Sequence, residues 1–160
     1  MTMIKTIEIT IKKNVFRILF CFMAIVSFSA DAQSSQSNIV GQWKSIDDKT
    51  GKAKSIIEIT EKNGIYTGRI IQLLNPSEPN PVCTKCKDGR KDQAIEGMII
   101  IENVSQKKTS WGGGTILDPK NGKTYKVKFT LVDEGKTLKV RGYIGLPTLG
   151  RTQTWERIQP

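Results

Sequence analysis

Two cysteines with C-x-x-C spacing are the residues of this sequence that most directly suggest chemistry. Cys83 and Cys86 lie in the segment NPVCTKCKDGRK, and the whole chain has no histidine. Such a pair can act as a thiol–disulfide redox centre, contribute to a metal site or form a structural disulfide. A thioredoxin-type redox centre starts a helix, which the preceding NPSEPNP disfavours. A zinc site needs four ligands, so a single copy of the motif could hold a metal only between two chains.

The N-terminus predicts the compartment, which bears on these three alternatives. Four basic side chains accompany an apolar run at 15–28, and this run ends at the A-x-A pattern Ala30-Asp31-Ala32. This arrangement predicts a secretory signal peptide at 1–32, cleaved after Ala32. The run is shorter than the about 20 apolar residues that span a bilayer, and Cys21 lacks the small preceding residues of a lipidation site. Export to the periplasm or the medium favours a structural disulfide between Cys83 and Cys86.

The remaining chain has the size of one domain and a basic composition. Residues 33–160 number 128 and carry 21 Lys and Arg against 13 Asp and Glu, a net charge of +8. We expect a flexible lead-in at 33–38 and one domain at 39–160, with the cysteine loop at 75–93. In an exported protein this charge indicates anionic lipid head groups or envelope polymers, or only solvated strand faces, rather than nucleic acid.

The catalytic inventory is small. Without histidine, triads that depend on it are excluded, and no Walker loop or G-x-S-x-G motif occurs. Asp47 and Asp118 could form a carboxylate pair, but both lie in turns, where aspartate usually accepts hydrogen bonds from local backbone amides. The glycine-rich WGGGT at 111–115 is interpreted as a flexible turn. We therefore expect no enzyme activity, no cofactor and no resident metal.

Alternating hydrophobicity predicts an all-β protein. In TYKVKFTL, Tyr125, Val127, Phe129 and Leu131 share one face and lysines occupy the other. Only 92–97 suggests a short helix, and turn signals such as Asn121-Gly122 separate the strands. We predict an antiparallel up-and-down β-barrel of about eight strands. The expected strands are 39–46, 54–60, 65–74, 98–104, 114–117, 123–132, 137–144 and 152–158.

The segment RGYIGLPTLGR, from Arg141 to Arg151, is apolar where a hairpin loop should be polar. We expect Ile144 on the inner face of its strand, and the loop either packs inward and plugs one barrel end or stays at the surface as a contact for ligand, lipid or partner. Leu146 and Leu149 would make that contact together with Ile144. The two arginines that bracket the loop could bind a carboxylate or phosphate.

Four longer stretches carry a family resemblance: GQWKSIDDKTGKAKSIIEI, PVCTKCKDGRK, ILDPKNGKTY and LKVRGYIGLPTLGRTQTW. Over about 40–157 the chain resembles the exported bacterial family called domain of unknown function 2147, which implies a lipocalin-like barrel. Gly41-Gln42-Trp43 is similar to the G-x-W that opens lipocalins, where the tryptophan packs under an arginine near the last strand. Arg151 and Arg157 are both candidates for that role.

These observations lead to one functional prediction and two alternatives. We predict a monomer that binds a small apolar or amphipathic envelope molecule inside the barrel, with peripheral membrane contact as a further expectation. The expected ligand contacts are Trp43, Tyr125, Phe129, Arg141, Tyr143 and Arg151. The alternatives are a basic protein- or polymer-binding module with a filled barrel, and a thiol–disulfide oxidoreductase at Cys83 and Cys86.

Overall fold

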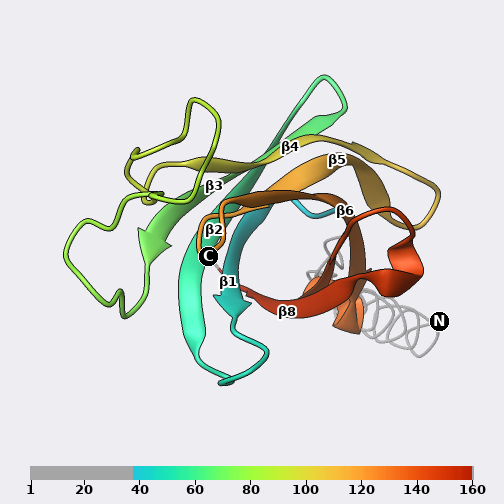
Figure 1. The fold of residues 1–160 in the computed structure, drawn as a ribbon. Helices are drawn as coiled ribbons and strands as arrows, with labels where there is room; N and C mark the ends of the chain where they lie inside the picture. The colour runs from blue at the N-terminus through green and yellow to red at the C-terminus, as the bar shows by residue number, and fades with distance from the viewer. Residues whose placement is uncertain (1–37, 160) are drawn as a thin grey trace, which may run out of the picture. The chain divides into compact units, whose positions relative to one another are not determined.

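The computed structural model of the protein describes residues 38–159, so the predicted signal peptide and nearly all of the predicted lead-in lie outside the described residues. Residues from 39 onward form a closed antiparallel barrel in which each strand pairs with the next and β8 pairs with β1 (Figure 1). The all-β, up-and-down prediction is confirmed. The strands are β1 (Gly41–Ile46), β2 (Ala53–Lys62), β3 (Ile65–Leu73), β4 (Ile99–Gln106), β5 (Trp111–Asp118), β6 (Lys123–Val132), β7 (Thr137–Tyr143) and β8 (Arg151–Arg157).

The alternating pattern places the core inside the barrel. On β6, Val127 and Phe129 are buried while Lys126 and Lys128 are exposed, as period two requires for a sheet with one wet face. Leu138 and Val140 repeat this arrangement on β7. The barrel therefore follows directly from the side-chain alternation.

Two local expectations were wrong. The WGGGT segment is the start of strand β5, where the pairing register shifts between Gly112 and Thr115. Its glycines allow close approach of β4, since a Cβ on Gly114 would lie 2.1 Å from the carbonyl oxygen of Glu102. The segment 92–97 forms turns instead of a helix, with Asp92 and Gly97 at positive φ. Among the described residues the helical elements are the short 3₁₀ turns η2 (Asp133–Gly135) and η3 (Pro147–Leu149), and none could span a membrane.

Trp43 and Arg157 close one end of the barrel. The Trp43 indole is fully buried and its Nε1 donates a 2.9 Å hydrogen bond to the carbonyl oxygen of Ile39. The Arg157 guanidinium lies 4.2 Å from the centre of the Trp43 ring and donates to three backbone carbonyl oxygens, those of Asn38, Val40 and Gly135. Burial lowers the pKa of Arg157. Of the two arginine candidates, Arg157 is therefore the one that packs over the tryptophan.

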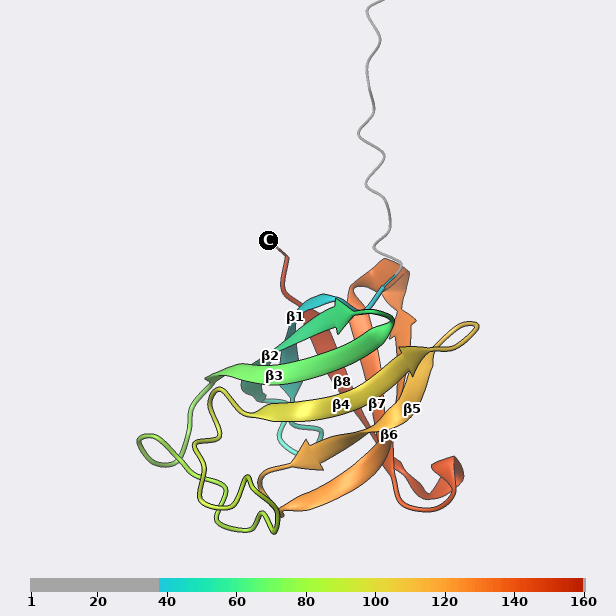
Figure 2. The same ribbon diagram turned by 90° about the horizontal axis from the view of Figure 1, so that it is seen from above.

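Four connections surround the opposite end: those between β1 and β2, β3 and β4, β5 and β6, and β7 and β8 (Figure 2). The longest, between β3 and β4, contains the predicted disulfide, which is confirmed: Cys83 and Cys86 are bonded and both are buried. This cysteine loop packs on the β5–β6 turn, where a Cβ on Gly122 would lie 1.9 Å from the carbonyl oxygen of Lys85.

Candidate functional site: a barrel cavity with a basic mouth

A cavity of about 810 Å³ extends from the ring of four connections into the barrel. Its deeper wall consists of apolar strand side chains, most of which the strand alternation turns inward. Polar and charged residues line the outer part, close to the connections. The principal apolar lining residues are Ile57, Ile70, Leu73, Ile100, Ile116, Leu117, Val140 and Trp155.

One side of the cavity, built from β8, β1 and β2, is polar. The Ser45 and Ser55 hydroxyls are 2.8 Å apart, and both residues are buried. Gln153 lies beside them in the lining and its Oε1 accepts a 3.3 Å hydrogen bond from Trp155 Nε1. The cavity thus offers hydrogen-bonding groups on one wall and apolar contact on the others, which is the usual composition of a small-molecule site.

The mouth of the cavity is basic. A recess of about 290 Å³ at this end is lined by five cationic side chains and two carboxylates. Among residues 38–159, none of the four lysines in this lining forms an ion pair. The local field therefore favours an anion. The cations are Lys49, Lys54, Lys85, Lys120 and Arg151, and the carboxylates are those of Asp47 and Asp118.

Both carboxylates of the recess cap their own turns, as the alternative to a catalytic pair predicts. Asp47 accepts hydrogen bonds from the backbone amides of Thr50 (2.9 Å) and Lys49 (3.0 Å), which hold its pKa below the ordinary value. Asp118 accepts from the amide of Lys120 (3.0 Å). These turns shape the mouth, and the carboxylates of Asp47 and Asp118 are directed at backbone amides of their own turns.

Arg151 is anchored at the mouth by an ion pair with Asp48, which lies next to Asp47 in the β1–β2 connection. The hydrogen bond from Arg151 lowers the pKa of Asp48, and the same contact raises the pKa of Arg151. The pair is partly exposed, so it positions the guanidinium more than it stabilises the fold.

A strongly lowered pKa lies outside the cavity, at Asp88. Hydrogen bonds from Arg90 lower the pKa of Asp88 to about 2. Arg90 also donates a 3.0 Å hydrogen bond to Glu102 on β4, so this group fastens the cysteine loop to the barrel wall. Within the described residues no three His, Cys, Asp or Glu side chains are grouped closely enough to hold a metal ion.

The structure gathers half of the predicted ligand contacts at the cavity. Tyr125, Tyr143 and Arg151 line it. Trp43 belongs to the closed end, and Phe129 is buried against Trp155 with ring centroids 6.3 Å apart, so both contribute core packing away from the lining.

The sixth predicted contact, Arg141, braces the β7–β8 loop. Its guanidinium donates to the carbonyl oxygens of Pro147 (2.6 Å) and Thr148 (3.0 Å) and to the Thr152 hydroxyl (2.8 Å). This bracing explains why the loop does not plug the barrel.

The plug interpretation and the inward placement of Ile144 are wrong. Strand β7 ends at Tyr143, and Ile144, Leu146 and Leu149 are 65%, 67% and 81% exposed. Ile144 and Leu149 contribute to the rim of the cavity. The loop therefore leaves the cavity open and presents apolar side chains to solvent.

Several lining residues were missed from the sequence, although a signal for some of them exists. Arg151, Gln153 and Trp155 alternate along β8, so one inward residue predicts the others. Lys85 and Lys120 lie in different loops, and only the barrel topology brings them to the same recess.

The comparisons with known proteins agree with this architecture. The family model described as "Uncharacterized protein conserved in bacteria (DUF2147)" matches residues 41–157. The chain belongs to this family. The predicted resemblance is thereby confirmed.

Among solved structures, the DUF2147 chain is similar to protein HP1028 from Helicobacter pylori, which is described as belonging to the lipocalin family. The two share 22% sequence identity with a TM-score of 0.66, over 76% of this chain and 84% of the other. No match was found among curated proteins. The similarity establishes a lipocalin-like fold for the DUF2147 barrel.

Proposed function

We propose that this DUF2147 protein is an exported carrier or sensor of a small amphipathic molecule with an apolar body and an anionic head group. The observation that carries the proposal is the combination of an apolar cavity with a basic mouth. The cavity volume of about 810 Å³ falls in the range of about 300–1,000 Å³ typical of small-molecule sites.

The two parts of the cavity fit the two parts of such a ligand. The inward strand residues remove the apolar body from water, which contributes roughly 25 cal/mol per Å² of buried apolar surface. The unpaired lysines and Arg151 meet the head group where it leaves the barrel. Export, proposed from the N-terminal pattern at 1–32, would place the protein where lipids and their fragments are available.

The alternatives have less support. A filled barrel would not contain an apolar cavity that opens to solvent, as this barrel does. The oxidoreductase alternative needs an accessible sulfur, whereas Cys83 is 0% and Cys86 is 1% exposed.

The test is displacement of the fluorescent probe anilinonaphthalene sulfonate by ligands that share one chain length. Dodecanoate, dodecanol and dodecyltrimethylammonium are each titrated against the protein–probe complex. We expect dodecanoate to displace the probe at about tenfold lower concentration than the cation. A Lys54→Glu/Lys120→Glu variant should lose this preference, while the exposed Lys62→Glu at the other end of β2 should keep it.

Two outcomes would contradict the proposal. If no ligand displaces the probe and the probe itself does not bind, the cavity has no binding function of this kind. If the three ligands compete equally, the cavity binds apolar chains but the anionic head group is wrong.

A further inference from the structure

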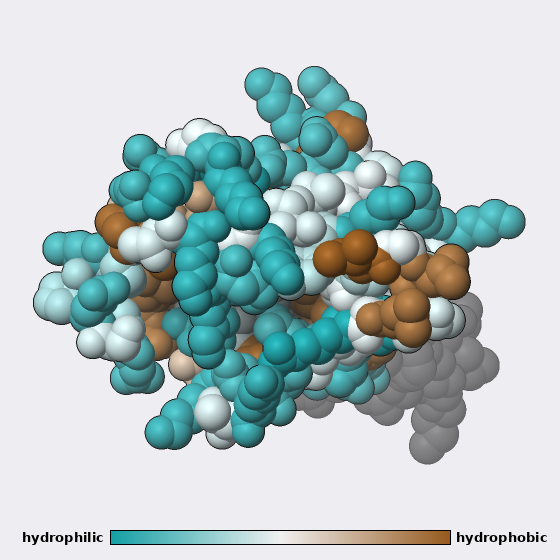
Figure 3. Space-filling view, in the orientation of Figure 1, coloured by the Kyte–Doolittle hydropathy of each residue, from teal (hydrophilic) through white to brown (hydrophobic). Residues whose placement is uncertain are grey.

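The β7–β8 loop carries an exposed apolar surface, which we name the apolar tip and define as Ile144, Leu146 and Leu149. Its side chains are 65%, 67% and 81% exposed, and they account for three of the five exposed large hydrophobic residues among the described residues. Hydrophobic atoms gather over this loop in the space-filling view (Figure 3). Exposed apolar patches of this kind mark interaction sites in soluble domains.

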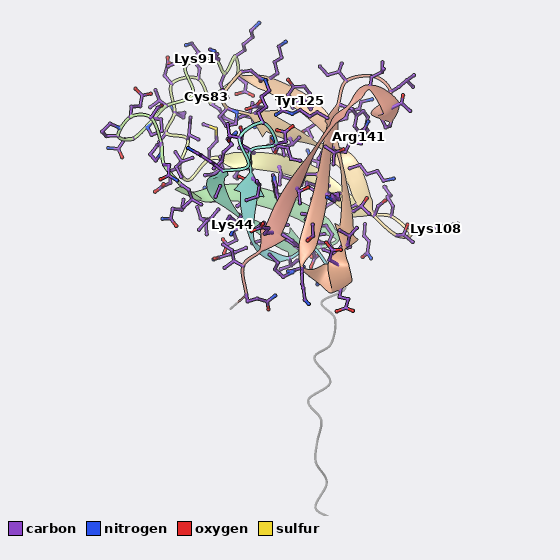
Figure 4. The ribbon with its side chains drawn as sticks, turned by 90° about the horizontal axis from the view of Figure 1, so that it is seen from below. Lys44, Cys83, Lys91, Lys108, Tyr125 and Arg141 are labelled. Atoms are coloured by element: carbon purple, nitrogen blue, oxygen red, sulfur yellow. A yellow bond between two sulfur atoms is a disulfide. The ribbon has the colours of Figure 1, made fainter. Side chains whose placement is uncertain are left out.

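The loop holds the apolar tip in a defined conformation. Arg141, which lies beneath the loop in Figure 4, donates to the carbonyl oxygens of Pro147 and Thr148. Backbone hydrogen bonds from Leu149 to Leu146 (3.1 Å) and from Gly150 to Pro147 (3.2 Å) close the η3 turn. The side chains are therefore directed into solvent by the loop structure itself.

A basic face adjoins the apolar tip. We define it as the outward side chains of β6 and β7: Lys126, Lys128, Lys139 and Arg141. Lys128 and Arg141 are direct cross-strand partners, and such like-charge pairs destabilise a sheet. Within residues 38–159 none of these four cations forms an ion pair. An external anionic surface would remove their mutual repulsion.

We propose that the apolar tip and the basic face together dock this protein on an anionic lipid bilayer. The tip enters the interfacial region while the lysines contact lipid head groups, each contributing about 1 kcal/mol near such a surface. Ile144 and Leu149 also line the cavity, so docking brings the cavity mouth to the membrane. This inference goes beyond the proposed ligand binding and does not depend on it.

A second copy of the chain is a poorer occupant. Stable interfaces bury about 800 Å² per partner, more than three side chains on one hairpin supply. Residues 38–159 of each copy carry 21 basic and 13 acidic side chains, so two copies repel each other. An anionic bilayer requires no matching shape and carries the opposite charge.

The test is co-flotation with vesicles, using exported protein whose N-terminus is established by intact mass. Vesicles of phosphatidylglycerol and phosphatidylcholine are compared with vesicles of phosphatidylcholine alone. We expect binding to the anionic vesicles, with a partition coefficient at least about tenfold higher than to the neutral ones. Leu146→Ser/Leu149→Ser should lower it about tenfold, whereas Ile65→Ser, an exposed apolar residue at the other end, should leave it unchanged.

Charge reversal supplies an independent pair of variants. Lys126→Glu/Lys128→Glu should lower the partition coefficient about tenfold or more, and Lys107→Glu/Lys108→Glu, at the β4–β5 turn, should change it by less than half as much on a logarithmic scale. Thermal unfolding verifies that each variant is folded. Probe displacement by dodecanoate should be retained by Leu146→Ser alone, since the cavity lining includes Leu149 but not Leu146, and this variant separates docking from ligand binding.

Three results would overturn the docking proposal. The first is that the unaltered protein does not bind anionic vesicles. The second is that the test variants and the control variants lose vesicle binding to the same extent. The third is unchanged vesicle binding of the tip variant together with loss of a dimer in analytical ultracentrifugation, which would make the tip a self-association surface.

Discussion

Gly142 offers a direct way to fill the cavity without disturbing the barrel. It lies on β7 and lines the cavity, and its backbone has no positive φ. A Cβ placed there would lie 3.6 Å from the Cβ of Tyr125 and 3.9 Å from Cγ2 of Ile116, which are ordinary van der Waals contacts. Because glycine in a strand interior costs about 0.5–1 kcal/mol relative to alanine, Gly142→Ala should stabilise the protein by that amount.

A larger side chain at the same position should act on binding. Gly142→Phe directs an aromatic ring from β7 into the space that we assign to the ligand. A ligand that must share this space loses about 1–3 kcal/mol, or about tenfold or more in affinity. Urea unfolding gives the stability of each variant, and titration with anilinonaphthalene sulfonate gives its affinity.

The alanine variant is the matched control for the phenylalanine variant. A second control is Gly114→Ala, whose Cβ would lie 2.1 Å from a β4 carbonyl oxygen and should therefore destabilise the barrel. If Gly142→Phe folds and binds the probe with unchanged affinity, the probe does not occupy the cavity. If Gly142→Ala is strongly destabilised, the assignment of open space beside this residue is wrong.

Three further predictions concern the long β3–β4 connection and its supports. Gly122→Ala should cost more in urea unfolding than Gly51→Ala, since both have φ of +69° but only the first meets the cysteine loop; equal losses would contradict that contact. Replacing both cysteines with serine should lower the free energy of unfolding by about 2 kcal/mol, as expected for so short a closed loop, and an unchanged urea midpoint would contradict this. Arg90 lowers the pKa of Asp88 to about 2. The contribution of this pair to folding stability is therefore complete above pH about 4 and is lost as the pH falls toward 2. When the thermal midpoint is measured against pH, Asp88→Asn should reduce the fall of the midpoint below pH about 4. An unchanged fall would exclude the Asp88–Arg90 pair as a source of acid sensitivity.

The fold was accessible from the sequence because its decisive signal is local. Alternation along β6 and β7 and the Asn121-Gly122 turn specify strands and hairpins within about ten residues of one another. All eight strands were located in this way, with boundaries shifted by a few residues. The prediction of a turn at 111–115 was wrong because glycine is required both in turns and where two strands approach closely. The residue type alone does not distinguish these two cases.

The site was less accessible because its parts meet only when the barrel closes. Tyr125 and Arg151 were expected at the cavity, but Lys54, Lys85 and Lys120 come from three separate connections or strand ends. The β7–β8 loop was misjudged for a different reason. Its composition favours packing, whereas the Arg141 side chain satisfies its carbonyl oxygens and holds its apolar residues outward.

The arginines at the two ends of β8 should separate stability from ligand recognition. They are six residues apart, or about 20 Å along a strand. Arg157 donates to three carbonyl oxygens and covers Trp43, so Arg157→Lys should lower the free energy of unfolding by about 2 kcal/mol without changing probe affinity.

Within residues 38–159 the Arg151 guanidinium pairs with one partly exposed carboxylate, that of Asp48, so Arg151→Gln should change stability by less than about 1 kcal/mol. It should nevertheless weaken dodecanoate binding more than dodecanol binding, because only the carboxylate meets the guanidinium. Urea unfolding measures the stability of both variants, and probe displacement measures their affinities for dodecanoate and dodecanol. If Arg157→Lys alters the head-group preference, or Arg151→Gln weakens both ligands equally, head-group selection does not reside at the basic mouth.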